Sequence, residues 1–303
     1  MEKVKKIDVH IHTSMWKGAQ INSHIVLASP EYLRKVYDEL GIEKGIVLPL
    51  VSPEFRFCVQ SNEEMEYLGN KYSDTFFWAC CVDPRMGKNN AESDLTYILN
   101  YYKERGAVGV GEVTANLDMD DPLVDNFFYH AEKCGMPVTI HVSHKKYDNY
   151  GLIDDVGLPK LERALKKFPN LKILGHAQAF WCEIDDNVTE QSREDYVKGP
   201  ANGGAILRLM RKYPNLYCDI SAGSGCNAMT RDPEFTYKFI EEFGDRLLFG
   251  TDICAEGQTT ALSKLSKWLD DSYDIGRISK ENYVNICRGN AIRIFNLNLP
   301  IDE

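Results

Sequence analysis

The stretch Lys-Ile-Asp-Val-His-Ile-His (Lys6 to His12) closes the first apolar run of the sequence and carries His10 and His12. In a β-strand, residues i and i+2 point to the same face, so both imidazoles should project together from one strand end. Imidazole is a common ligand of Zn²⁺ and related ions. The stretch therefore predicts half of a metal site at the end of the first strand.

Several later apolar runs end in the same kind of residue. Each run is a short aliphatic or β-branched stretch, and each is followed by a loop that contains Gly, Ser or Asp. Metal ligands show this pattern when they come from the carboxyl ends of parallel strands, which is where barrel enzymes build their sites. The candidate ligands found in this way are Glu112, His141, His176 and Asp252.

Strand and helix patterns alternate along the chain and predict an α/β fold, a (β/α)₈ TIM barrel, as a single domain over residues 1–303. A doubly wound open sheet is disfavoured, because no Gly-rich phosphate loop follows the first strand. In addition, the candidate ligands lie at the ends of several different strands, and only closure into a barrel brings those ends together. The expected strands are Ile7–His12, Gly45–Leu50, Phe76–Val82, Ala107–Val113, Val138–His141, Leu171–Gly175, Leu216–Ile220 and Leu247–Gly250. The expected helices are Pro30–Leu40, Asn62–Tyr72, Ala91–Arg105, Pro122–Cys134, Leu158–Phe168, Gly204–Tyr213, Pro233–Phe243 and Thr259–Leu269, with small helices in Lys280–Leu297.

Composition limits the partners. The net charge of −10 argues against nucleic acid, which needs a basic surface. No apolar run approaches the roughly 18 residues that span a bilayer, so we expect no membrane. The nine cysteines are an odd number without a C-x-x-C motif, which indicates reduced thiols and a cytoplasmic protein.

Six pieces of the sequence, in order along the whole chain, carry a family resemblance. With them the chain resembles the metal-dependent amidohydrolase superfamily, and it is most similar to the branch with lactonases and aminocarboxymuconate-semialdehyde-type decarboxylases. The pieces are Asp8-x-His10-x-His12, Val82-Asp83-Pro84-Arg85, His141, the Leu161-Glu162…Phe168-Pro169-Asn170-Leu171 approach to His176, Phe249-Gly250-Thr251-Asp252, and Gly289-Asn290-Ala291.

The resemblance implies roles for five of the candidate ligands. His10, His12 and Asp252 would bind a divalent ion, with His141 as a further ligand. His176 would act as a general acid/base, and Asp252 would also take a proton from bound water, whose pKa a metal lowers to about 7. Zn is the expected metal, and Mn, Fe or Co also suit nitrogen and oxygen ligands.

Glu112 departs from this branch, which does not generally place a metal-binding carboxylate on strand four. Other superfamily members, including TatD-like hydrolases, do place a Glu there in a Gly-Glu context. Glu112 could therefore bridge two ions, one on His10, His12 and Asp252 and one on His141 and His176. A Glu can instead pair with a buried Arg or Lys, so one and two ions per chain both remain open.

Long loops after strands one, five, six and eight predict a substrate pocket at the carboxyl ends of the strands. The loop residues that could bind substrate are Trp16, His144, Trp181 and Arg231. For each there is a plainer alternative, because aromatic residues often pack a loop down and polar ones are often solvated.

These observations predict a metal-dependent hydrolase that attacks a carbonyl of a small molecule, such as a lactone, amide or ester, through metal-activated water. One alternative is a decarboxylase of an unsaturated or aromatic carboxylic acid. A second is a barrel that binds metal or ligand without catalysis. Association into a homo-oligomer is open, because barrel helices often associate.

Overall fold

The computed structural model describes residues 3–16, 26–55 and 59–301, so 17–25 of the expected loop after the first strand lies outside the described residues. Eight strands form the barrel, and all their pairings are parallel. They are β1 (Lys6–Ile11), β2 (Ile42–Val47), β3 (Phe76–Trp78), β4 (Val110–Val113), β5 (Val138–Ser143), β7 (Ile173–His176), β8 (Leu216–Asp219) and β9 (Leu247–Leu248). A further short strand, β6 (Leu152–Ile153), pairs with the end of β5 and is not part of the barrel order.

The strands close on themselves. The named pairings give two runs, β1-β2-β3 and β4-β5-β7-β8-β9. A bridge between Cys80 and Val110 joins β3 to β4, and one between Ile11 and Ile253 joins β1 to the segment after β9. The architecture is therefore the predicted (β/α)₈ barrel, with β7, β8 and β9 as its sixth, seventh and eighth strands.

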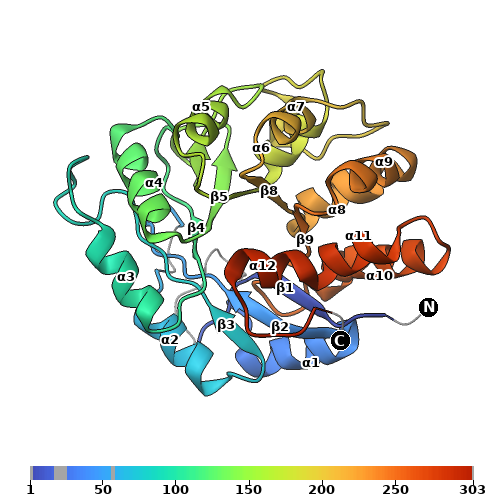
Figure 1. The fold of residues 1–303 in the computed structure, drawn as a ribbon, viewed down its shortest axis with the longest axis horizontal. Helices are drawn as coiled ribbons and strands as arrows, with labels where there is room; N and C mark the ends of the chain where they lie inside the picture. The colour runs from blue at the N-terminus through green and yellow to red at the C-terminus, as the bar shows by residue number, and fades with distance from the viewer. Residues whose placement is uncertain (1–2, 17–25, 56–58, 302–303) are drawn as a thin grey trace.

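Helices cover the outside of the strands (Figure 1). The predicted helices all occur: α1 (Pro30–Leu40), α2 (Asn62–Lys71), α3 (Thr96–Glu104), α4 (Pro122–Cys134), α5 (Pro159–Lys167), α7 (Ala205–Lys212), α9 (Pro233–Phe243) and α10 (Thr259–Asp274). Helix α3 begins five residues later than expected, and just before its first turn the Asp94 carboxylate accepts a hydrogen bond from the Thr96 N–H at 2.8 Å. The terminal segment forms α11 (Lys280–Val284), the π-helix η3 (Asn285–Gly289) and α12 (Asn290–Phe295).

Besides β6, four short helical elements in the loops were not predicted. They are α6 (Gln178–Trp181), η1 (Cys182–Ile184) and η2 (Ser192–Glu194) after β7, and α8 (Ala222–Thr230) after β8. The α8 sequence Ala-Gly-Ser-Gly-Cys-Asn has weak helix formers, so tertiary packing rather than propensity decides this helix. None of the described helices is long and apolar enough to cross a bilayer.

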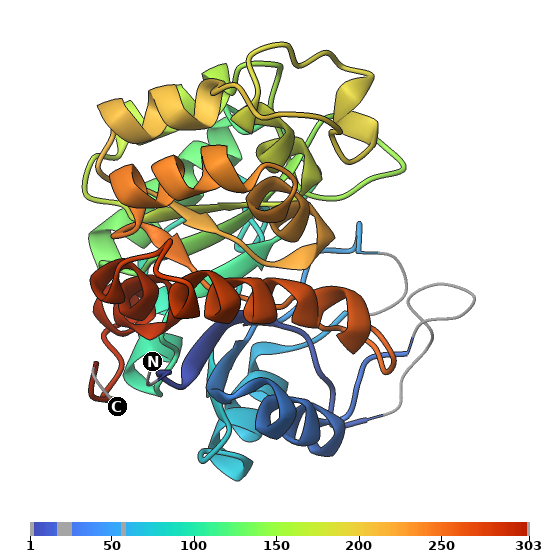
Figure 2. The same ribbon diagram turned by 90° about the vertical axis from the view of Figure 1, so that its right-hand side faces the viewer.

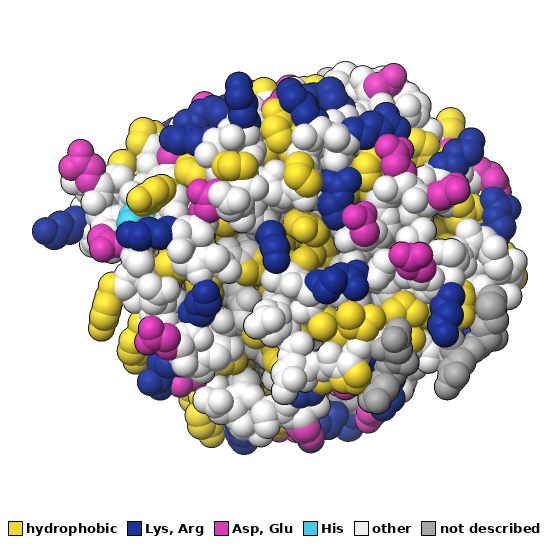
Figure 3. Space-filling view, in the orientation of Figure 1, with side chains coloured by type: hydrophobic (Ala, Val, Ile, Leu, Met, Phe, Trp, Pro, Cys, Tyr) yellow, Lys and Arg dark blue, Asp and Glu magenta, His cyan; other side chains and the backbone are white. Residues whose placement is uncertain are grey.

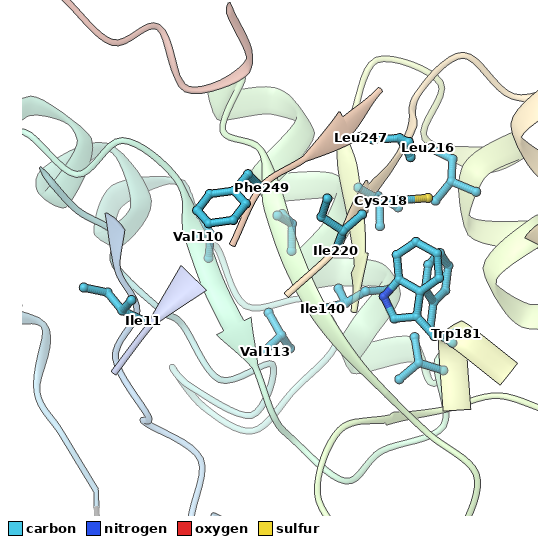
Figure 4. Close-up of a cluster of buried hydrophobic side chains, with 14 of the residues drawn as sticks. Ile11, Val110, Val113, Ile140, Trp181, Leu216, Cys218, Ile220, Leu247 and Phe249 are labelled. Atoms are coloured by element: carbon cyan, nitrogen blue, oxygen red, sulfur yellow. The ribbon is translucent and has the colours of Figure 1, made fainter. Parts of the chain in front are cut away.

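Two apolar clusters hold the barrel. The larger lies between strands and helices and includes Val113, Ile140 and Ile220 from the strand segments (Figure 4). The smaller, which we name the floor cluster, joins strand residues such as Ile7 and Leu248 to α12 and its neighbour Leu297. Figure 2 shows both chain ends on one side and the long segment around 185–204 on the other. The carboxyl ends of β5 and β7, at His141 and His176, border a pocket.

Candidate metal centre

His10 on β1 and His12, which follows the end of β1, meet at the carboxyl end of the strand. Both side chains are buried, and the Nε2 atoms of His10 and His12 lie 3.1 Å apart. The register of β1 on β2 shifts between Asp8 and Ile11. Irregularities of this kind re-aim side chains beside active sites. Here Ile7 belongs to the floor cluster while His10 and His12 face the opposite end.

The Nδ1 atom of each histidine already has a hydrogen-bond partner. The Nδ1 of His10 lies 2.6 Å from Asp219 Oδ2, and the Nδ1–H of His12 donates to the Leu48 carbonyl at 2.9 Å. A carboxylate or carbonyl partner at one nitrogen is what orients a metal-binding imidazole and fixes its tautomer. Both Nε2 atoms are thereby left to face an ion.

Glu112 lies between two pairs of histidines. Its Oε2 is 3.6 Å from His10 Nε2 and 3.4 Å from His12 Nε2. Its Oε1 is 2.6 Å from His141 Nδ1 and 3.7 Å from His176 Nε2. The partners of this buried carboxylate are thus imidazoles, whereas the plainer alternative needed a buried Arg or Lys.

A glycine lets Glu112 reach this position. Gly111 has a φ of +143°, and a Cβ there would lie 2.7 Å from the carbonyl oxygen of Thr139 on β5. A side chain at position 111 would therefore push β4 away from β5. The Gly-Glu pair that the sequence shows is a packing requirement for the carboxylate after it.

Asp252 approaches from the segment after β9. Its N–H donates to the His10 carbonyl at 2.8 Å. Its Oδ1 is 3.6 Å from the Nε2 of both His10 and His12, and its Oδ2 is 3.9 Å from His176 Nε2. The side chain is 27% exposed, while that of His10 is fully buried. Asp252 is therefore the donor that borders the open space.

These donors fit a divalent ion. An ion with four ligands at ~2.0–2.1 Å in tetrahedral geometry keeps its ligand atoms ~3.3 Å apart. The five separations given above among His10 Nε2, His12 Nε2, Glu112 Oε2 and Asp252 Oδ1 run from 3.1 to 3.6 Å. Among the described residues, Glu112, His141 and His176 form another group that could hold an ion. There, however, the 2.6 Å contact of His141 with Glu112 is a direct hydrogen bond.

Charge at the site also favours a cation. Burial lowers the pKa of His10, but the carboxylates of Asp219, Glu112 and Asp252 outweigh it and raise that pKa well above its usual value. Burial raises the pKa of Glu112, and His141 and His10 bring it well below the usual range. Three carboxylates thus lie around His10, and a divalent ion would neutralise part of their negative charge.

His176 behaves differently. Burial and the positive charge of His10 lower the pKa of His176 to about 3. Its Nδ1 lies 3.0 Å from Ser221 Oγ and 3.5 Å from Asp219 Oδ2. The ring is therefore neutral at pH 7, with Nε2 directed toward Glu112 and Asp252.

Sequence reasoning missed Asp219. This buried carboxylate ends β8 and contacts the Nδ1 of His10. It follows the apolar run that begins at Leu216, just as the recognised candidates end their own runs. The rule that found the others would have found it on the seventh strand. Since it holds the outer nitrogen of His10, it acts through that histidine.

A pocket of about 460 Å³ opens beside the donors and is lined by His141, His176 and Asp252. Of the four predicted substrate-binding residues, His144 lies on this lining. The other three do not. Trp16 is 62% exposed, stacks on Tyr67 and borders a separate hollow.

Two of those three side chains make structural contacts. Trp181 is buried, and its indole N–H donates to the Asp219 carbonyl at 3.0 Å, so it supports β8 from behind. Arg231 forms an ion pair with the buried carboxylate of Asp185. Both side chains hold loops in place, as the plainer alternative allowed.

Comparison with known proteins bears on the whole chain. A family model described as amidohydrolase matches residues 7–297. No curated protein sequence matches the chain.

Three solved structures illustrate the similarity of fold. A probable 2-pyrone-4,6-dicarboxylic acid hydrolase from Acinetobacter baumannii, with citric acid bound, has a TM-score of 0.61 at 14% identity, covering 97% of this chain and 100% of that one. A 2,6-dihydroxybenzoate decarboxylase from Rhizobium has a TM-score of 0.57 at 17% identity, covering 99% and 100%. An amidohydrolase from Burkholderia multivorans with bound zinc has a TM-score of 0.59 at 14% identity, covering 96% and 99%.

Proposed function

The chain belongs to the amidohydrolase family, and from that premise we propose that it is a metal-dependent hydrolase that cleaves a small carbonyl compound such as a lactone, amide or ester. The observation that carries the proposal is the donor set of His10, His12, Glu112 and Asp252, whose spacing suits one divalent ion. The same set opens through Asp252 onto a pocket large enough for a small molecule.

Zinc is the metal we propose. Nitrogen and carboxylate donors at this spacing suit it, and the zinc-bound relative of the same fold supports the choice. When bound, a divalent ion supplies Lewis acidity, which polarises a carbonyl and makes water more acidic.

Asp252 is the residue we assign to proton transfer. Its Oδ1 faces His10 and His12, while the partly exposed carboxylate borders the pocket. Burial raises the pKa of Asp252, which makes it a stronger base than an exposed carboxylate. It would accept the proton of the attacking water and pass it to the leaving group.

His176 is the residue we assign to the substrate oxygen. Being neutral, it can carry its proton on Nε2, while Nδ1 accepts from the Ser221 hydroxyl. An N–H directed into the pocket can donate to an oxygen on which negative charge develops. This role needs no change in protonation at neutral pH.

We further propose that Glu112 can bridge two ions. It directs one oxygen at His10 and His12 and the other at His141 and His176. The second ion would require His141 to move away from Glu112, because their hydrogen bond occupies that side. We therefore expect the first ion to bind more tightly.

The test is metal analysis followed by turnover. Purified protein loaded with zinc, manganese or cobalt is offered neutral and acidic lactones, esters and amides in ¹⁸O-labelled water. We expect metal-dependent turnover with one ¹⁸O atom in the product. Release of CO₂ from an aromatic or unsaturated acid without incorporation of ¹⁸O would establish the decarboxylase alternative, to which the Rhizobium enzyme's fold lends support. Full metal occupancy without turnover of any class would favour a binding protein.

Partners and location follow as proposals. On the face drawn in Figure 3, Lys and Arg side chains are interspersed with Asp and Glu, which suits a small-molecule substrate better than nucleic acid. The eight cysteines that the structure describes are free thiols, most of them buried, and we propose a reducing, cytoplasmic environment. Gel filtration with light scattering would test for a homo-oligomer.

A further inference from the structure

A buried cation lies in the wall of the pocket. Arg193 belongs to the short helix η2 in the loop after β7, and its side chain is fully buried. It lines the same pocket as His176 and Asp252. Burying a guanidinium is costly unless its donors are satisfied, so the partners of Arg193 are informative.

One edge of this guanidinium has no hydrogen-bond partner in the described part of the chain. The Nη1 donates to the Asp154 carbonyl at 2.8 Å, whereas Nε and Nη2 are buried and make no hydrogen bond. Glu183 Oε1 lies 3.7 Å from Nε, beyond hydrogen-bond distance, and already accepts from the Gly157 N–H. Glu190, whose side chain is mostly exposed, lies 3.8 Å from Nη1.

The edge formed by Nε and Nη2 of Arg193 has the geometry to bind a carboxylate side-on. Nε and Nη2 are two parallel donors on one side of the guanidinium plane. Elsewhere in this chain the same pair of atoms holds a carboxylate side-on: Arg105 binds Glu66 at 2.8 and 2.5 Å, and Arg211 binds Glu242 at 2.7 and 2.8 Å. In Arg193 this pair faces no carboxylate within hydrogen-bond distance.

A second unsatisfied polar atom lies on the same pocket. The Nε2 of His144 is buried and has no hydrogen-bond partner among the described residues. Glu194, which is largely exposed, lies 3.7 Å from it. Burial and the charges of Lys145 and Arg193 lower the pKa of His144, so its ring is neutral at pH 7 and Nε2 can carry a proton to donate.

We propose that Arg193 and His144 form a carboxylate-binding subsite in this pocket, and that the substrate is a small carboxylic acid. Its carboxylate would accept from Nε and Nη2 of Arg193 and from Nε2 of His144. Its reacting carbonyl would face His176 and Asp252 on the same lining. This inference rests on the proposed metal-dependent hydrolase and names the class of substrate that it selects.

The experiment measures ligand binding by zinc-loaded protein, with metal content determined separately by mass spectrometry. The probes are the linear diacids succinate, glutarate and adipate, each compared with its monoamide by calorimetry. Both members of a pair offer one carboxylate to the metal, so the difference reports the second carboxylate. We expect at least one diacid to bind the wild type about 10- to 100-fold more tightly than its monoamide.

The variants assign that difference to Arg193. R193Q should abolish the preference for the diacid with metal content unchanged, and R193K should retain only part of it, because lysine lacks the two-donor edge. H144A should weaken binding of the diacid by a smaller factor than R193Q does. R211Q, whose side-on edge binds Glu242 on the surface, is the matched control and should bind like the wild type. If R193Q fails to fold, R193K and H144A decide the question by the same readout.

Equal affinity for diacid and monoamide in the wild type, a preference that survives in R193Q, or a preference that is undiminished in both R193K and H144A overturns the subsite. Either result leaves the hydrolase proposal standing, because metal content and turnover of neutral lactones are measured independently. If the wild type failed to bind metal at all, that result would instead contradict the hydrolase proposal itself.

Discussion

The two ends of the barrel are built from the same strands, but one end is apolar and the other buries polar and charged side chains. At the amino end, Ile7 and Leu248 pack on Phe295 in the floor cluster. A few residues further along the same segments, His10 and Asp252 are polar and face carboxylates and imidazoles. The floor gains free energy from burial of apolar surface, whereas the site buries charge at a cost that an ion offsets. Stability and chemistry are thus separated along each strand.

The largest effect should come from breaking the donor set. His10→Ala or Asp252→Ala removes one ligand, so we expect activity to be abolished and bound metal to fall. Plasma mass spectrometry and turnover measure both. His130→Ala is the matched control, since that buried histidine contacts Thr96 away from the site. Full activity with full metal in either site variant would refute the assignment of the centre.

A substitution in the floor cluster should lower stability and leave the metal site intact. Phe295→Ala removes a buried aromatic side chain from the floor cluster and should lower the free energy of unfolding by about 3–5 kcal/mol. Urea denaturation measures this change, with Tyr97→Ala on the exposed face of α3 as the control. Metal content per folded chain should stay the same. A loss of metal at full folding would show that the two ends are coupled.

A smaller loss of metal affinity should follow a change at Asp219, which contacts the ligand His10 without being a ligand itself. Asp219→Asn keeps the shape of the side chain but removes the charge that holds His10 Nδ1, and we expect metal affinity to drop about 10- to 100-fold. Chelator competition measures the affinity. Asp185→Asn alters another buried carboxylate, the partner of Arg231, and should leave affinity unchanged. Equal affinity in Asp219→Asn would reduce this residue to a packing role.

The smallest expected effect concerns the number of metal ions bound per chain. Glu112→Gln weakens a bridging ligand, so at saturating metal we expect the number of ions per chain to fall from two to one. The remaining ion keeps His10, His12 and Asp252. Titration followed by elemental analysis gives the count. One ion per chain in the wild type would contradict the bridge and leave His176 solely as a donor to the substrate oxygen.

Sequence alone predicted the barrel because the fold repeats locally. Each strand is a short apolar run and each helix an amphipathic segment, and starts such as Ser29-Pro30 and Asp121-Pro122 place caps by local chemistry. In the structure the side chains of Ser29 and Asp121 both accept backbone N–H groups of the helices that follow them. The polar residues at the strand ends were readable for the same reason, since position along a strand is a local property.

Tertiary structure decided which polar residues share a space. Asp219 looked like any strand-end residue, and its contact with His10 joins positions 209 residues apart. Trp181 and Arg231 looked like pocket residues, yet their loops turn them inward. Arg193 lies in a polar loop, and its burial depends on how that loop packs on α6 and on the segment around Asp154. Local pattern determines elements, but the burial and pairing of a charge depend on every segment packed against it.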